Sequence, residues 1–267
     1  MTSAANEQRP AGDAWAPLAD RFVLAHYATL RGAVRTHVID AHLRAHLPSP
    51  PAAVIDVGGG AGNQSIPLAR SGYQVTIADP SEAMLAAAAE ALSREPGEVS
   101  GRVRLVRASA EHARSAVGGE RFGAVLCHGV IMYVDDPRPF TAALADLAEP
   151  GAIVSLVAKN AACLAVRPAL AGRWAEAMAA FDAIRQVNGL GVDTRADTVE
   201  DLSELLSQAG VATVAWYGVR LFTDGWIGAD GPGDDASAAL LAVELEASRR
   251  DPYRQLSRLF HLVGVRS

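Results

Sequence analysis

The sequence contains few cysteines and almost no lysine. Cys127 and Cys163 are the 2 cysteines of the 267 residues, and they do not form a Cys-x-x-Cys pair. Neither a disulfide framework nor a cysteine-based zinc site can be argued from them, and they fit a reducing compartment. Lys159 is the single lysine, so arginine supplies nearly all of the basic charge.

Long apolar runs are also missing. A membrane-spanning helix needs about 20 consecutive apolar residues, and the alanine-rich stretch Met84–Leu92 is far shorter. The segment Met1–Pro17 has no apolar run preceded by lysine or arginine, as a secretory signal would have. We therefore expect a cytoplasmic protein without a membrane partner.

The balance of charge is acidic. The chain carries 24 basic and 30 acidic residues, a formal net charge of −6. No global positive field therefore attracts nucleic acid or an anionic membrane, although net charge does not describe local patches. The 7 histidines are scattered and the acidic residues show no ligand spacing, so we expect no metal site.

After a loose tail at residues 1–12, apolar residues recur at helical spacing between Ala14 and Leu47. The run Pro48-Ser49-Pro50-Pro51 ends this helical region. Strands then alternate with helices, which predicts an α/β fold with a parallel, doubly wound sheet. The expected strands are 53–57, 74–79, 103–107, 122–128, 152–158, 212–222 and 259–266, and the expected helices are 63–71, 81–93, 139–148, 200–208 and 236–250.

The segment between Asn160 and Thr198 breaks this alternation. It contains helical stretches around Gly172, Gly189 and Gly191, and no strand is expected within it. A regular strand–helix unit does not need about forty residues at this point. We expect a helical cap, about residues 160–198, that covers the site.

A glycine-rich turn follows the first strand. Gly58, Gly60 and Gly62 are spaced G-x-G-x-G, whereas dinucleotide-binding turns read G-x-G-x-x-G. Asp56 directly precedes the turn, and a carboxylate there would repel a pyrophosphate. It suits the cationic amino and sulfonium groups of S-adenosylmethionine. Glycines, including Gly59, let the backbone approach such a ligand closely, although a glycine turn alone is often only a tight connection.

Three further strands of the predicted sheet end beside the glycine turn, and the residues at their ends are candidates for the same site. Asp79 closes the second strand, where a carboxylate accepts hydrogen bonds from ribose hydroxyls. Ser109 and Ala110 follow the third strand, where adenine would lie, or they are simply loop residues. His128 ends the fourth strand, either as a ligand or catalytic residue or as a structural strand-end histidine. The convergence predicts a cofactor site at a topological switch point.

The chain resembles the class I S-adenosylmethionine-dependent methyltransferases. Residues 54–62 resemble their first motif, and from about Ala19 to Val263 the chain is similar to bacterial enzymes that methyl-esterify carboxymethoxyuridine in tRNA. The resemblance rests on residues 27–35, 127–130, 134–138, 160–161, 217–224 and 251–253 with Arg258 and His261. It implies a Rossmann-like methyltransferase fold with a seven-stranded, mostly parallel sheet and a helical cap after strand five. Residues 1–52 would form a tail and helices that cover the cofactor site, and residues 53–267 the methyltransferase domain.

By the same resemblance, a set of residues spread over the chain would contact S-adenosylmethionine. Arg35 is a sensible partner for the methionine carboxylate, because guanidinium pairs with carboxylate through two hydrogen bonds. Arg220 either holds an acidic group of the acceptor or is a surface arginine, and Tyr133 and Asn160 are further acceptor-binding candidates. The implied cofactor contacts are Arg35, Gly58, Gly59, Asp79, Ser109, Ala110 and His128.

The sequence departs from the tRNA enzymes in the cap. Those enzymes carry a lysine-rich stretch there, whereas residues 185–193 contain only one basic residue, and Met132 replaces an aromatic residue. Binding a tRNA backbone requires several phosphate contacts. The main expectation is therefore methyl transfer to a polar small molecule bearing a carboxylate or hydroxyl. The alternatives are a tRNA carboxymethoxyuridine methyltransferase and a non-catalytic cofactor-binding protein.

The acceptor decides whether a base is needed. Methyl transfer from a sulfonium is an in-line displacement, so catalysis consists largely of aligning nucleophile, methyl and sulfur. A carboxylate acceptor requires no general base. A hydroxyl acceptor benefits from one, and the candidate catalytic residues are then His128, His26 and Tyr27.

Overall fold

A seven-stranded sheet forms the centre of the computed structural model, which describes residues 29–189, 191–224 and 234–267. The strand order is β3-β2-β1-β4-β5-β9-β8. Only β9 runs antiparallel to its neighbours β5 and β8, so the predicted mostly parallel sheet is confirmed. The strands are β1 Ala53–Val57, β2 Gln74–Asp79, β3 Val103–Arg107, β4 Phe122–His128, β5 Ala148–Lys159, β8 Val211–Val219 and β9 Leu259–Arg266.

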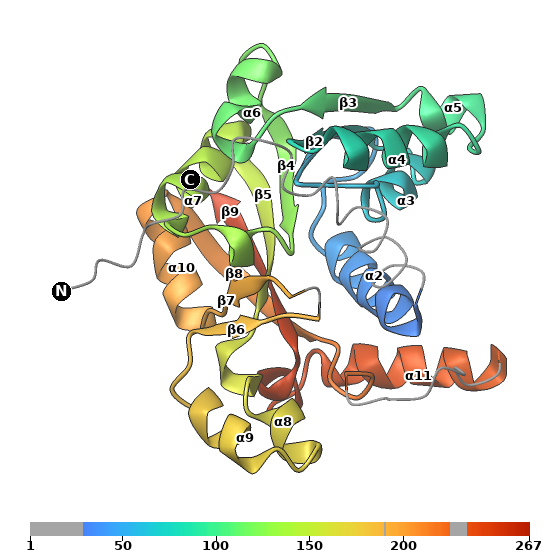
Figure 1. Ribbon diagram of the computed structural model, residues 1–267. Helices are drawn as coiled ribbons and strands as arrows, with labels where there is room; N and C mark the ends of the chain where they lie inside the picture. The colour runs from blue at the N-terminus through green and yellow to red at the C-terminus, as the bar shows by residue number, and fades with distance from the viewer. Residues whose placement is uncertain (1–28, 190, 225–233) are drawn as a thin grey trace.

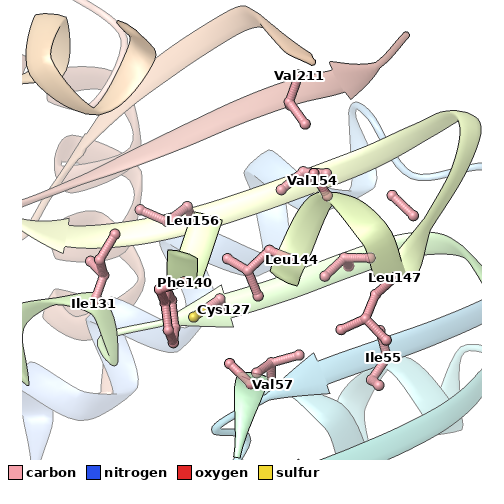
Figure 2. Packing of buried hydrophobic residues seen from close by; sticks show 14 of the residues in the cluster. Ile55, Val57, Cys127, Ile131, Phe140, Leu144, Leu147, Val154, Leu156 and Val211 are labelled. Carbon is pink, nitrogen blue, oxygen red and sulfur yellow. The ribbon is translucent and has the colours of Figure 1, made fainter. Parts of the chain in front are cut away.

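Helices cover both faces of the sheet (Figure 1). One face carries α2 Leu30–Arg44, α3 Ser65–Arg70, α4 Glu82–Leu92, α5 Gly97–Ser100 and α11 Asp234–Ala247, and the other carries α6 Ala110–Ala116, α7 Pro137–Leu147 and α10 Val199–Gln208. On the second face, Phe140, Leu144 and Leu147 lie against the apolar side chains of the central strands (Figure 2). Their burial removes much apolar area from water, which stabilises the layered arrangement.

Local sequence explains where several helices begin. Ser81 accepts a hydrogen bond from the backbone N–H of Met84 at 3.3 Å, as expected of an N-cap, and Glu82 follows in the first turn. Thr198 caps α10 in the same way through Asp201. Helices α5 and α6 were not predicted, because each is shorter than the window over which helical periodicity becomes visible.

The prediction that no strand lies between Asn160 and Thr198 is wrong. The segment contains the helices α8 Val166–Leu170 and α9 Trp174–Ala180, but also a hairpin of β6 Arg185–Val187 and β7 Asp193–Arg195. Gly191, with φ +80°, contributes to the turn that joins the two strands. Strands of three residues are too short to show an alternating pattern. Gly189 and Gly191 lie in the turn of this hairpin, whereas Gly172 lies between α8 and α9.

The strand expected over 212–222 ends earlier than predicted. β8 stops at Val219 because Arg220 adopts φ +64°, a left-handed conformation that no regular strand contains. Cys127 and Cys163 are both buried and free. In the described part of the chain, no helix is long and apolar enough to cross a membrane.

Candidate active site

The glycine turn packs tightly against the loop after β4. Gly58 has φ +72° and Gly60 has φ +55°, conformations that a side chain would strain. A Cβ atom on Gly58 would lie 2.3 Å from Cγ2 of Val130, and one on Gly60 would lie 2.7 Å from Cε of Met84. The turn is therefore bare backbone at the carboxyl edge of the sheet.

Asp79 ties this turn to the end of β2. Its Oδ2 accepts a hydrogen bond from the N–H of Gly60, and its Oδ1 accepts one from the N–H of Ser81, both at 2.9 Å. The side chain is buried. A carboxylate offers about four lone-pair sites, more than these two hydrogen bonds use.

Asp56 lies beneath the turn rather than in front of it. It is only 2% exposed, and its Oδ2 accepts a hydrogen bond from the Ser65 hydroxyl at 2.6 Å. A Cβ atom on Gly59 would lie 2.8 Å from the same oxygen. Burial raises the pKa of Asp56 to about 6. These contacts support the turn from below.

The residues after β3 take positions at the start of a helix. Ser109 occupies the N-cap position of α6, and its hydroxyl contacts Nδ1 of His112 at 3.0 Å rather than a backbone N–H. Ala110 is the first residue of α6 and is buried. Both lie at the same carboxyl edge as Asp79, since β2 and β3 are parallel neighbours.

His128 and Arg35 meet at the end of β4. Nη2 of Arg35, on α2, donates a hydrogen bond to the backbone carbonyl of His128 at 3.0 Å. Nε2 of His128 contacts the hydroxyl of Ser155 at 2.8 Å, and Nδ1 is buried without a hydrogen-bond partner. Burial, and to a lesser extent Arg35, lowers the pKa of His128 to about 3, so the ring is neutral at neutral pH.

A cavity of about 320 Å³ opens beside His128 and Arg35. Its walls are formed by α2, the end of β5, the start of β9, the loops that follow β4 and β8, and the cap segment, residues 160–198. Six basic side chains line it: Arg31, Arg35, Lys159, Arg167, Arg220 and Arg258.

One carboxylate balances three of these arginines. Asp224 forms an ion pair with Nη2 of Arg220, and its Oδ2 lies 3.5 Å from Nε of Arg167 and 4.0 Å from Nε of Arg258. Nε of Arg220 and Nη1 of Arg258 are buried without a hydrogen-bond partner. The three arginines, Lys159 and Asp224 are called the cationic pocket below. Two of its N–H groups are therefore unsatisfied by the described residues, which is uncommon for buried arginine nitrogens.

Lys159 adds a cation held by neutral oxygens. Its Nζ donates to Oγ1 of Thr194 at 3.0 Å and to the carbonyl of Gln186 at 3.2 Å, which joins β5 to the hairpin of the cap. Burial, and to a lesser extent the nearby Arg258, lowers the pKa of Lys159 to about 8. Burial likewise lowers the pKa of Arg220.

Of the other two residues predicted to bind the acceptor, one lines the cavity and one does not. Tyr133 lines the cavity, and its hydroxyl accepts from Nδ2 of Asn188 at 3.3 Å. Asn160 is not among the lining residues, because its Nδ2 donates to the carbonyls of Gln255 and Ser257 and its Oδ1 accepts from the N–H of Ala162. His26 and Tyr27 lie outside the described residues. Within the described ranges, no cluster of three metal-ligating side chains is present.

Most residues of the cationic pocket were not predicted from the sequence. Lys159 ends β5, and Arg258 precedes β9. The antiparallel register pairs Lys159 with Leu259, which places both cations at the same edge of the sheet. The available signal was a basic residue at each of these two strand ends, but their proximity depends on β9 inserting in reverse between β5 and β8.

The family pattern described as a methyltransferase domain matches residues 55–156, which include the glycine turn, Asp79 and His128. The chain is an S-adenosylmethionine-dependent methyltransferase with a Rossmann-like fold. It is 28% identical to the tRNA 5-carboxymethoxyuridine methyltransferase of Escherichia coli over 92% of this chain and 94% of that one.

Solved structures agree with this methyltransferase fold. The CcbJ methyltransferase from Streptomyces caelestis superposes with a TM-score of 0.61 at 15% identity, over 96% of this chain and 98% of that chain. The glycopeptide N-methyltransferase MtfA, solved with S-adenosylmethionine, superposes with a TM-score of 0.56 at 15% identity, over 87% of this chain and 94% of that chain. At such identities the likeness concerns the fold alone.

Proposed function

We propose that this methyltransferase methylates a carboxylate of its acceptor, forming a methyl ester. The observation that carries the proposal is the pair of buried, unsatisfied N–H groups on Arg220 and Arg258 in the cationic pocket. Arginine N–H groups bind carboxylates through strong charge-assisted hydrogen bonds. Three arginines share the single carboxylate of Asp224, so an acceptor carboxylate would complete the charge balance of the pocket.

The residues around the glycine turn fit S-adenosylmethionine. The bare backbone of the turn provides a cradle that side chains on Gly58 and Gly60 would disrupt. Asp79 would accept hydrogen bonds from the ribose, and Ser109 and Ala110 would border the adenine. Arg35 would pair with the methionine carboxylate, while Asp56 would support the turn from below. The bound cofactor supplies a methyl group activated by a positively charged sulfur.

A carboxylate acceptor agrees with the ionisation of His128. A carboxylate is already a nucleophile at neutral pH and needs no proton removed. With a pKa of about 3, His128 is a weak base at neutral pH. We therefore assign it a role in orienting the ligands and assign alignment of the acceptor to the cationic pocket.

We further propose that the acceptor is a small molecule. Most exposed arginines in the described chain pair with a nearby carboxylate, as Arg104 does with Glu120 at 2.7 Å and Arg121 with Asp146 at 3.0 Å. Cations already neutralised in this way have less attraction for a phosphate backbone. The cap segment, residues 160–198, contributes Arg167, Asn188 and Thr194 to the cavity and would select the acceptor.

The test uses S-adenosylmethionine labelled in the methyl group. The protein is incubated with a tRNA-free metabolite extract or with bulk tRNA, and the products are then exposed to mild alkali. We expect label in the metabolite fraction that alkali releases as volatile methanol, as a methyl ester requires. Alkali-stable label would overturn ester formation, and label confined to ribonuclease-sensitive material would overturn the small-molecule acceptor.

A second candidate is the carboxymethoxy group of a wobble uridine in tRNA. The similarity to the Escherichia coli enzyme extends over nearly the full length of both chains and therefore includes the cap. This acceptor also presents a carboxylate, so it would use the same cationic pocket. Alkali-labile label in tRNA would support it.

A further inference from the structure

A chain of buried polar side chains leads from the cavity across three neighbouring strands. At its cavity end, Nε2 of His128 on β4 contacts the hydroxyl of Ser155 on β5 at 2.8 Å. The same hydroxyl contacts Nε2 of His261 on β9 at 2.7 Å. All three side chains are buried.

The series of contacts between buried side chains continues to α2 and to the residue that follows α11. Nδ1 of His261 contacts Nδ1 of His42 on α2 at 3.4 Å, the longest link. Nε2 of His42 contacts the hydroxyl of Ser248 at 2.8 Å, and that hydroxyl donates to the carbonyl of Leu245 at 2.6 Å. The histidine chain consists of His128, Ser155, His261, His42 and Ser248.

The three rings of the histidine chain are neutral at neutral pH. Burial lowers the pKa of His128 and of His42 to about 3, and it lowers the pKa of His261 well below the usual value. The nearby Arg249 and His46 contribute to the lowered pKa of His42, as Arg35 does to that of His128. Each neutral ring carries one N–H donor and one acceptor nitrogen.

The far end of the histidine chain determines the direction of every link. Ser248 has one hydroxyl proton and donates it to a carbonyl, so Nε2 of His42 must donate to Ser248. Nδ1 of His42 is then an acceptor, which makes Nδ1 of His261 a donor and its Nε2 an acceptor. Ser155 consequently donates to His261.

The direction of these links reaches the cavity. Since the Ser155 proton goes to His261, Nε2 of His128 must donate to the Ser155 hydroxyl. A neutral ring that carries its proton on Nε2 presents a bare lone pair on Nδ1. That Nδ1 atom is the buried nitrogen without a partner in the protein.

We propose that the histidine chain holds His128 in the Nε2-protonated form, so that Nδ1 accepts a hydrogen bond from the ammonium group of the cofactor's methionine portion. The other members of the chain are thus positioning residues. The inference rests on the cofactor placement given under the proposed function, but not on the identity of the acceptor.

The ammonium group is favoured by the order of the strands. If adenine borders Ser109 after β3 and the ribose reaches Asp79 after β2, the methionine portion extends towards β1 and β4. There Arg35 donates to the backbone carbonyl of His128 and lines the same cavity. The Arg35 guanidinium would bind the carboxylate, and the neighbouring Nδ1 of His128 would bind the ammonium group. This pair of groups is complementary to the two charged ends of an amino acid.

The protonation state of the ring is tested directly by nuclear magnetic resonance. In protein labelled with nitrogen-15 in histidine, two-bond proton–nitrogen correlations distinguish the two neutral forms, and the His128→Gln variant identifies the signals of His128. We expect an Nε2-protonated ring with an unprotonated Nδ1. A proton on Nδ1 in the wild-type protein would overturn the proposal.

The consequence for binding is tested with two ligands by calorimetry. S-adenosylhomocysteine carries the ammonium group, and 5′-methylthioadenosine lacks the whole amino acid portion. In Ser155→Ala, the affinity for S-adenosylhomocysteine should fall about tenfold, as for one lost hydrogen bond, and that for 5′-methylthioadenosine should be unchanged. Equal losses for both ligands, or no loss for either, would overturn the proposal.

Ser248→Ala provides a remote variant at the other end of the histidine chain. It should produce a mixture of the two forms of His128 and a smaller loss of S-adenosylhomocysteine affinity in the same direction. It keeps the proposal testable if Ser155→Ala does not fold, and an unchanged His128 spectrum would contradict the proposal.

The matched control is Tyr217→Phe, which removes a hydroxyl bound to His46 but retains the ring stacked on His42. Both measurements should be unaffected in this control.

Discussion

The arginines inside the cationic pocket differ from those on the outer surface. In the pocket, Arg167, Arg220 and Arg258 share one carboxylate, and two of their N–H groups have no partner. On the surface, pairs such as Arg44–Asp40 and Arg138–Asp136 neutralise each cation locally. Among the described residues, the cationic pocket thus combines four cations with one carboxylate, and this excess of positive charge favours binding one small anionic group rather than an extended polyanion.

Loss of a pocket arginine should have the largest effect on activity. In Arg258→Met, kcat/KM for methyl transfer into the acceptor fraction should fall about a thousandfold, because a buried charge-assisted interaction is removed. The affinity for S-adenosylhomocysteine should not change. Arg104→Met removes a surface arginine paired with Glu120 and serves as the control, with less than about a twofold effect. Similar losses in both variants would eliminate the distinction between pocket and surface.

Removal of the pocket's carboxylate should have the next largest effect. Asp224→Asn leaves three clustered guanidinium groups without a counter-charge, so the free energy of unfolding should fall by about 3 kcal/mol. The surface variant Glu120→Gln should lower it by less than about 1 kcal/mol. Both are measured by urea unfolding monitored by circular dichroism. A loss for Asp224→Asn no greater than that for Glu120→Gln would contradict the assigned role of Asp224.

Activity should depend on pH through Lys159. In the proposed reaction the protonated form of Lys159 attracts the acceptor carboxylate, so kcat/KM should be highest below pH 8 and decrease by about tenfold at higher pH, as for one charge-assisted hydrogen bond. Lys159→Met should abolish this decrease. Unfolding would not explain this decrease in kcat/KM. The pKa of Lys159 is about 8 in the folded protein and 10.5 in the unfolded chain, so the unfolded state binds more protons between these two pH values. This difference makes the folded state more stable as pH rises. A persistent decrease in Lys159→Met would exclude Lys159 as its cause.

Salt should have the smallest effect. A protein with six to ten phosphate contacts loses about 10³-fold or more in affinity between 50 and 200 mM salt. For a small acceptor in the cationic pocket we expect a loss in kcat/KM of less than about tenfold over the same range. A thousandfold loss would reveal contacts to a nucleic acid backbone and overturn the small-molecule acceptor.

The sequence alone was sufficient for much of the fold and for the position of the glycine turn and Asp79 at one edge of the sheet. β9 was predicted with its observed bounds, Leu259–Arg266, and β2 likewise, because runs of β-branched residues between turn signals are local features. The glycine turn and Asp79 are also local, since each directly follows its own strand. The hairpin of β6 and β7 was missed because its stability depends on contacts outside the segment, such as that of Lys159 with Thr194.

The cationic pocket required the tertiary structure. Arg167, Arg220, Asp224 and Arg258 come from three separate segments, and no spacing along the chain shows that one carboxylate serves three arginines. The histidine chain likewise joins residues up to 219 positions apart. Sequence periodicity determined the strands, the helices and the turn that identifies a methyltransferase, because these arise from neighbouring residues. The reversed insertion of β9 between β5 and β8 brought Lys159 and Arg258 together, because proximity between remote segments is decided by packing.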